Sequence, residues 1–250
     1  MSNFDLNEID LGNTQSNETD YIGFSYKIFE SGLYKATINK CYGITPKEGK
    51  TKGVTLEFEV ESTNEQGNKE NSIFNYTIWL TNKNGEAFYI NKKSGNKERL
   101  PGYNLFETIT FAAVGKEIKE LNKPTNEIID LYNFEQKKEV PTEVPMFKEL
   151  IGKSVALGLI KEERNKTIKD KATGEYVAIA DKVIANEIDK VFTIKGGKVF
   201  TMTEMKSGLE EPTFFTTWLN RNKGNTRNKY QEIEGVEEQP KAGKTTESIF

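Results

Sequence analysis

Apolar and polar side chains alternate along three segments near the start of the chain. These segments are GLYKATINKCYG (32–43), VTLEFEVES (54–62) and SIFNYTIWL (72–80). Alternation of this kind is typical of β-strands that bury one face. In the third segment it places Trp79 on the face opposite Phe74, Tyr76 and Ile78. We therefore predict three strands joined by polar loops, with Trp79 on the outer face.

The hydrophobic period changes after the third strand. YNLFETITFAAVG (103–115) has apolar residues at helical spacing and ends on Gly115, which predicts a short helix with a glycine stop. A glycine pair at 196–197 between two apolar runs predicts a hairpin over 190–205. Further strands are expected at 86–90, 153–163 and 176–188.

Residues 116–149 fit neither period. They contain Pro124, Pro141 and Pro145 among many charged residues, and proline inside a run argues against a central strand. We predict an irregular insertion with a helical turn near 126–132.

The order of short strands, one helix and more strands predicts a mainly β fold. It suits a five-stranded OB-type Greek-key barrel with enlarged loops, one or two short helices and flexible termini. A β-sandwich is the alternative. The predicted organisation is a flexible acidic arm (1–25), an OB-type domain (26–212) with the insertion at about 116–149, a basic aromatic segment (213–230) and a flexible acidic tail with an apolar tip (231–250).

Composition excludes several classes of chemistry. The chain has no histidine and one cysteine, Cys41. A disulfide framework, a Cys/His zinc site and every histidine-based catalytic mechanism are therefore excluded. No cofactor is expected. The first twenty residues lack a signal-peptide pattern, and no apolar run is long enough to span a membrane. We expect a cytoplasmic protein with no membrane partner.

Charge is distributed unevenly along the chain. The net charge is −3, but residues 1–20 carry five acids and no base, and residues 231–250 carry five acids and two bases. The remaining 33 bases and 28 acids make residues 21–230 mildly basic. A basic body between acidic ends favours a polyanionic partner, although charged ends also aid solubility.

Sites for enzymatic chemistry are weak in this sequence. Glu57, Glu59 and Glu61 lie on one strand face, where acids more often form a solvated surface than a metal site. No phosphate-binding loop of the form GxxxxGK[ST] occurs. The Gly-Lys-Thr at 243–245 lacks the strand, the glycine spacing and the helix that such a loop requires. We expect a protein without enzymatic activity.

Basic residues beside aromatic residues point to a different chemistry. Single-stranded nucleic acid is bound by cations that follow the phosphates and by aromatic rings that stack on bases. Trp79 is the strongest stacking candidate, with burial under the insertion as its structural alternative. The candidate residues are Tyr42 with Lys47, Lys50 and Lys52; Trp79 and Tyr89 with Lys92, Lys93, Lys97 and Arg99; and Trp218 with Arg221, Lys223, Arg227 and Lys229.

Three features resemble bacteriophage single-stranded DNA-binding proteins. They are the strand pair SGLYKATINKCYG and KGVTLEFEVES, the helix-like YNLFETITFAAVG after the third strand, and the terminal ESIF. The resemblance implies an OB fold, sequence-tolerant binding of single-stranded DNA, and a role in DNA replication or recombination. It also implies that Glu247, Ile249 and Phe250 dock on a replication or recombination protein such as a polymerase, helicase-primase or recombinase. Lys241 and Lys244 depart from the dense acidic run that usually precedes such a tip.

The sequence therefore predicts a non-enzymatic protein that binds and protects single-stranded DNA in the host cytoplasm. Self-association into a homo-oligomer stays open. A structural or protein-interaction β domain, such as a virion component, is the alternative, and a Mg²⁺-dependent nuclease is a third reading.

Overall fold

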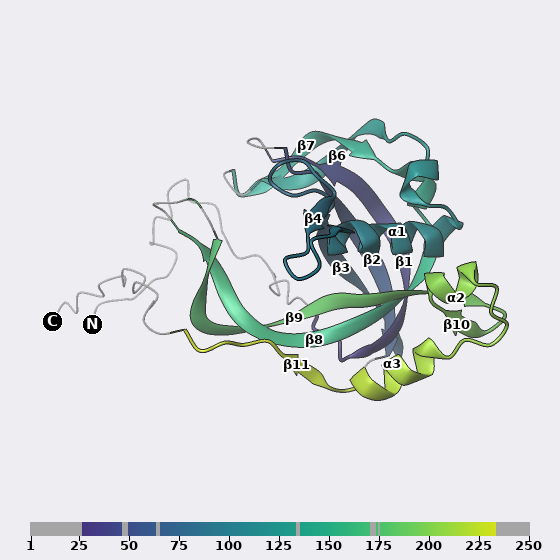
Figure 1. The fold of residues 1–250 in the computed structure, drawn as a ribbon. Coiled ribbons are helices and arrows are strands. Elements are labelled where there is room, and N and C mark those ends of the chain that lie inside the picture. The colour runs from purple at the N-terminus through teal and green to yellow at the C-terminus, as the bar shows by residue number, and fades with distance from the viewer. Residues whose placement is uncertain are drawn as a thin grey trace, which may run out of the picture.

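Long antiparallel strands make up most of the computed structural model, which describes residues 27–46, 50–63, 66–133, 136–170, 174 and 176–233 (Figure 1). The mainly β prediction is confirmed. In chain order the elements are β1 (Gly32–Ile44), β2 (Gly53–Thr63), β3 (Lys69–Trp79), β4 (Phe88–Ile90), β5 (Lys97–Arg99), α1 (Pro101–Val114), the 3₁₀ turn η2 (Ile118–Glu120), β6 (Thr125–Asn133), β7 (Lys138–Met146), the 3₁₀ turn η3 (Lys148–Leu150), β8 (Ser154–Lys169), β9 (Tyr176–Lys195), β10 (Lys198–Phe200), α2 (Met202–Lys206), α3 (Phe214–Asn222) and β11 (Thr226–Asn228).

The first three strands form an antiparallel meander, as their alternation predicts. Ile38 of β1 lies opposite Phe58 of β2, and Phe58 lies opposite Phe74 of β3. Because directly paired residues point to the same side of a sheet, all three side chains face the core.

Helix α1 follows β3 after the small β4–β5 hairpin. Pro101 occupies the first turn, where its missing N–H costs nothing. The helix ends at Gly115, which has a φ of 72° and donates its N–H to the Phe111 carbonyl. Gly102 lets the helix approach β3, since a Cβ at this position would lie 2.1 Å from the Trp79 carbonyl oxygen.

The insertion is a β-hairpin, so the prediction of an irregular segment with a helical turn is wrong. Strands β6 and β7 pair over their full length, with Pro141 opposite Asp130 and Pro145 opposite Asn126. Strand β7 is bonded to β1 at one position, Tyr42 with Met146, and is an edge strand elsewhere. The two prolines are four residues apart, so the nitrogens of both point to the side of β7 away from β6. That side is bonded to β1 at only one register position, so it tolerates residues without an N–H.

Strands β8 and β9 form a long ribbon that extends beyond the rest of the sheet (Figure 1). Strand β9 runs without a break through residues 176–195, where the sequence predicted a separate strand after residue 188. Its hairpin with β10 turns at Gly196 and Gly197, which have φ values of 57° and 75°.

Residues 202–206 are helical, in contrast to the predicted second hairpin strand, because a capping box starts a helix there. Thr201 accepts from the backbone N–H of Glu204, and the Glu204 carboxylate accepts from the N–H of Thr201. The predicted basic aromatic segment then forms α3 and the short β11, which pairs in parallel with β8.

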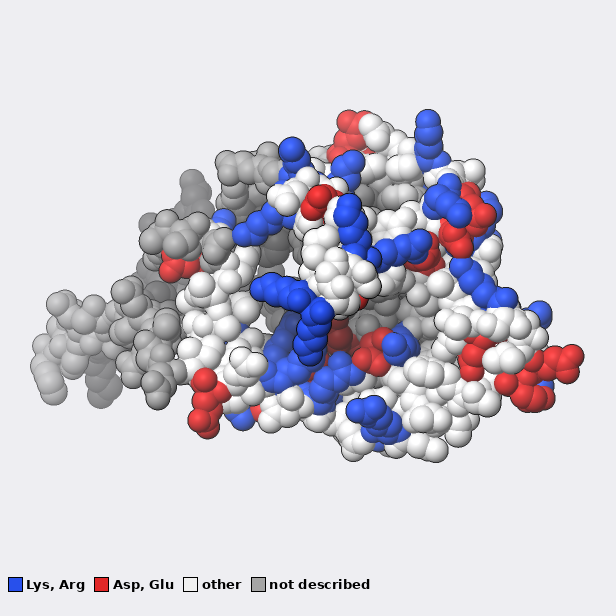
Figure 2. All heavy atoms as spheres, in the orientation of Figure 1, with Lys and Arg blue, Asp and Glu red and all other residues white. Residues whose placement is uncertain are grey.

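The main sheet has the order β10-β9-β8-β1-β2-β3 and remains open between β9 and β3. Across the part of the chain that the structure describes, no backbone pairing joins these two strands, so the predicted closed barrel is not formed. Helix α1 contacts both β3 and β9. In the orientation of Figure 1, the surface is hollowed between α1 and the β8–β9 ribbon, with acidic and basic side chains in the hollow (Figure 2).

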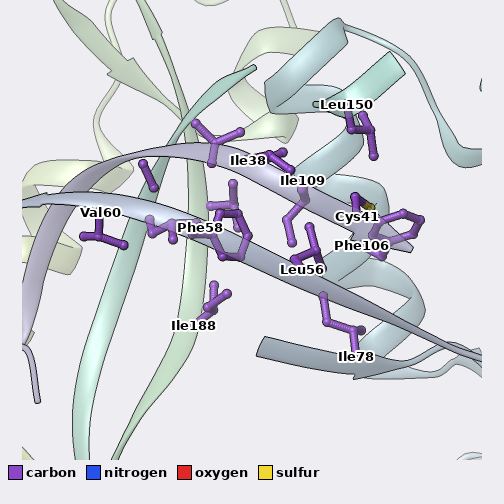
Figure 3. Close-up of a cluster of buried hydrophobic side chains, with 14 of the residues drawn as sticks. Ile38, Cys41, Leu56, Phe58, Val60, Ile78, Phe106, Ile109, Leu150 and Ile188 are labelled. Carbon is purple, nitrogen blue, oxygen red and sulfur yellow. The ribbon is translucent and has the colours of Figure 1, made fainter. Parts of the chain in front are cut away.

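The hydrophobic core lies between the sheet and α1 (Figure 3). Phe58 of β2, Ile78 of β3 and Ile188 of β9 meet Phe106 and Ile109 from the helix. The core therefore joins the two sides of the opening through the helix, and it leaves a groove along the outer part of the opening.

Candidate nucleic-acid interface

Trp79 lies at the end of β3 on the outer face of the sheet, with 47% of its surface exposed. Its indole lies across Gly53 of β2, and a Cβ at position 53 would be 2.7 Å from Trp79 Cε3. The glycine therefore lets the ring lie against the strand backbone. The prediction that Trp79 faces outward is confirmed, and its burial under the insertion is excluded.

The loop before β2 brings two lysines to the same end of the sheet. The Lys52 carbonyl accepts the N–H of Leu80, one residue after the tryptophan, at 2.8 Å. The aliphatic part of Lys50 packs near Gly85. Both ammonium groups are exposed, and neither pairs with an acid in the described ranges. Lys47 lies outside the described residues.

The β4–β5 hairpin adds cations and aromatic rings at this end. Asn82 fixes the preceding turn, because its side chain accepts the N–H of Glu86 at 3.0 Å and donates to the Phe88 carbonyl at 3.3 Å. Lys97 Nζ lies 4.4 Å from the centroid of the Phe88 ring. Lys92 and Lys93 are exposed at the hairpin turn.

Two predicted residues of this hairpin already have strong partners. Tyr89 is exposed, but its hydroxyl donates to the Glu98 carboxylate at 2.6 Å. Arg99 pairs with Glu107 of α1 at 2.6 Å and lies over the Tyr103 ring. Arg99 therefore serves to fix the hairpin against the helix, while Tyr89 keeps an exposed ring.

Tyr42, a candidate nucleic-acid-binding residue, is buried in the structure. It is only 9% exposed and packs with Val144 and Met146 in a small apolar cluster. The β6–β7 hairpin covers it, because β7 meets β1 at this residue. The sequence pattern did not predict this burial, because the prolines of β7 led us to expect an irregular segment in place of the hairpin.

Trp218 is also buried, in contrast to its predicted role. It is 5% exposed, packs edge-on against Phe192 at 5.6 Å, and lies against Gly158, where a Cβ would come within 2.9 Å of the indole. Its indole N–H donates to Asp189 Oδ2 at 2.7 Å. Trp218 therefore anchors α3 to the ribbon and has no free face for a base.

Arg227 and Lys229 are neutralised by acids of the ribbon. Arg227 pairs with Asp189, and Lys229 Nζ lies 2.9 Å from Glu162 Oε2. Burial opposes ionisation of Asp189, but hydrogen bonds from Trp218 and Arg227 hold its pKa below the usual range. These two predicted DNA contacts are therefore structural. Arg221 and Lys223 remain exposed, and neither has an acidic partner among the residues described.

A groove of about 860 Å³ lies in the opening between β3 and β9. Its walls are the end of β3 with Trp79, the first turns of α1, the middle of β9 and the start of α2. Phe214, the first residue of α3, also lines the groove and is 41% exposed. Sequence reasoning missed this residue. Helical spacing gives no signal for it, because Phe214 lies one turn before the buried Trp218 on the same side of α3.

Each acid that lines this groove accepts hydrogen bonds from the protein itself. Glu187 accepts from the Tyr76 hydroxyl, and Asp189 from Trp218 and Arg227. Burial alone would raise the pKa of Glu204, but backbone N–H groups of Thr201, Phe214 and Thr213 lower it to about 2. Among the residues described, Asp189 is paired with a cation, Arg227, whereas Glu187 and Glu204 accept from neutral donors and keep their negative charge.

We expect Glu204→Gln to lower stability on the order of 2 kcal/mol at pH 7, because its ionised carboxylate holds the start of α3. Since the folded pKa is about 2 and the ordinary value is 4.5, this contribution is complete above about pH 4.5 and is lost as pH falls toward 2. Urea unfolding at several pH values should show the gap between wild type and variant narrowing below about pH 4.5. Glu210→Gln, an exposed acid nearby, is the matched control, and an equal effect of both changes would contradict this role.

The outer face of β2 carries the three glutamates of the metal hypothesis. Glu57 pairs with Lys40 at 2.8 Å, Glu61 pairs with Lys35 at 2.6 Å, and Glu59 accepts from Asn71 at 3.1 Å. Within the described ranges, no three acidic or cysteine side chains come together in a metal-binding arrangement. Acids therefore occupy the middle of this face, and unpaired positive charge is concentrated at its Trp79 end.

The predicted partner-binding residues Glu247, Ile249 and Phe250 lie outside the described residues, as does the predicted acidic arm. Among the helices described, none is long and apolar enough to cross a membrane. No protein-family model matches the chain, and a search of the curated proteins found no matching relative.

Proposed function

We propose that this protein binds single-stranded DNA, without enzymatic activity, at the surface around Trp79. The observation that carries the proposal is an exposed indole held on a glycine backbone beside the unpaired Lys50 and Lys52. A fixed aromatic face next to cations is the combination that binds a stacked base and its phosphates.

The strand order supports an OB-type assignment for this domain. Strands β1, β2 and β3 form a meander, α1 follows the third strand, and β8 returns to pair with β1 before β9 pairs with β8. OB folds are five-stranded, partly open Greek-key barrels that bind oligonucleotides on the face of strands 2 and 3 and on the loop between strands 1 and 2. Trp79 and the lysines occupy the corresponding places.

The mechanism follows from the two kinds of group. A base stacked on Trp79 would contribute about 1–3 kcal/mol, and it would do so for any base because each has a π face. Lys50, Lys52, Lys92, Lys93 and Lys97 would neutralise phosphates on either side. A duplex would bind less well, because its bases are stacked on one another and cannot reach the indole.

Salt dependence tests this mechanism. If roughly 3–5 phosphates are neutralised, the logarithm of the association constant should fall against the logarithm of salt concentration with a slope of about −2 to −3.5. We expect the double change Lys50→Gln and Lys52→Gln to reduce the steepness by about 1–2. The control is Lys35→Gln, a lysine that already pairs with Glu61. A slope near zero for the wild type would contradict phosphate neutralisation.

A role in DNA replication or recombination, with partner proteins docked by residues 247–250, is part of the same proposal and rests on the sequence resemblance. A self-assembling structural β domain is the second candidate. It is favoured by exposed apolar side chains on the projecting hairpins, where Ile128 is 74% and Tyr176 is 73% exposed. A defined assembly in light scattering together with no DNA affinity would favour that candidate.

A further inference from the structure

We propose that the bound strand continues from Trp79 through the groove between β3 and β9 to α3, where Phe214 provides a second stacking ring. This inference rests on the proposed function, since it extends the path of the same ligand. It adds a base-binding residue that lies far from Trp79 in the sequence and on a different element.

Phe214 is exposed and held in a fixed position. It is 41% exposed, and its backbone N–H donates to Glu204 Oε1 at 2.9 Å. One side of its ring lies near Phe192, with the centroids 6.5 Å apart. Lys190 Nζ is 5.8 Å from the centroid of the Phe214 ring. A fixed ring next to a cation repeats the arrangement at Trp79.

Phe214 also lies where two recesses meet. The groove of about 860 Å³ is lined by both Trp79 and Phe214. A second recess of about 490 Å³ continues beyond it and is lined by Thr217, Arg221 and Asn225. The two share Asp189, Lys190 and Phe214 in their walls, so the recess along α3 adjoins the groove that begins at Trp79.

The positive charge along this path lies at its α3 end, whereas the groove of about 860 Å³ is lined by Glu187, Asp189 and Glu204 with Lys190. Lys190 and Arg221 line the second recess and have no acidic partner in the described part of the chain. The Asp189 carboxylate accepts hydrogen bonds from Trp218 and Arg227, and the Glu187 carboxylate accepts one from the Tyr76 hydroxyl.

A peptide strand is a less suitable ligand for the same groove. Binding by strand addition needs a free sheet edge with accessible backbone groups. At the Trp79 end of β3 the edge is covered by the first turn of α1, where Gly102 lies against the Trp79 carbonyl. Exposed rings at both ends of the groove, each with a cation nearby, favour nucleobases instead.

The test compares single-stranded oligothymidylate of about 16 nucleotides, which covers a full site, across variants of the full chain. We expect Phe214→Ala to weaken binding about 5- to 100-fold and Phe214→Trp to preserve it. Tyr176→Ala is the control, because it removes a ring that is even more exposed, at 73%, from the distal ribbon. Phe214→Leu keeps an apolar contact with Phe192 but removes the aromatic ring, so its affinity can be measured if the alanine variant unfolds.

The outcomes separate this inference from the proposed function. Wild-type affinity in both Phe214→Ala and Phe214→Leu, combined with weaker binding by Trp79→Ala, would overturn the groove path alone. Loss of affinity in the Phe214 variants and in Arg221→Gln, with Tyr176→Ala unchanged, would support it. No binding of the oligonucleotide by the wild type would overturn both.

Discussion

Replacing Trp79 with alanine is expected to weaken binding of single-stranded DNA about 5- to 100-fold, because it removes the face on which a base stacks. Stability should change by less than about 1 kcal/mol, since nearly half of the side chain is already exposed. Fluorescence anisotropy with a labelled oligonucleotide measures the first quantity, and urea unfolding measures the second.

Two further variants make this result specific. Trp79→Phe keeps an aromatic face and should retain most of the affinity. Ile73→Ala removes an exposed apolar side chain from the same face of β3, where 51% of the isoleucine is accessible, and should bind normally. If wild type and Trp79→Ala bind DNA equally well, Trp79 is not a base-stacking residue, whatever the affinity of the wild type.

Replacing Trp218 with alanine is expected to lower the stability of the fold strongly, whereas Trp79→Ala should mainly lower DNA affinity. The change removes a buried indole that packs on Phe192 and Gly158 and donates to Asp189. Large-to-small changes of this kind lower stability by about 3–5 kcal/mol. The urea midpoint should therefore fall strongly, and near-ultraviolet circular dichroism should lose the signal of a fixed indole.

Trp218→Phe separates packing from the hydrogen bond. It keeps an aromatic ring against Phe192 but loses the N–H donor, so Asp189 keeps only its pairing with Arg227. We expect an intermediate loss of stability. Trp79→Ala is the natural control, because these are the two tryptophans of the chain. Similar stability losses from both alanine changes would contradict the assignment of one as a surface ring and the other as an anchor.

Local periodicity was sufficient for the strands with one buried face and for α1. The alternation in β1, β2 and β3 fixed both their extent and the outward direction of Trp79, because a period of two determines the face directly. It failed for β6 and β7, where Pro141 and Pro145 resembled loop residues but occupy an edge. Which strand becomes an edge depends on tertiary pairing, and no local pattern records it.

The candidate site was predictable only in part for a similar reason. Cations are visible in a sequence, but their partners are not. Arg227 and Lys229 lie among bases in the chain, yet Asp189 and Glu162 of the ribbon neutralise them. Trp218 lies four residues after Phe214, so the helical period places both rings on one side of α3 and does not tell the buried ring from the exposed one. The groove itself depends on the opening between β3 and β9, which no single segment encodes.

One titration shows whether this protein binds single-stranded DNA, as we propose. The full chain is added at about 50 mM salt to a fluorescein-labelled single strand of about 16 nucleotides, and anisotropy is compared with that of a duplex of equal length. We expect a saturable rise in anisotropy for the single strand, weaker binding of the duplex, and loss of affinity as the salt concentration increases. No rise for the single strand, or equal affinity for the duplex, would contradict it.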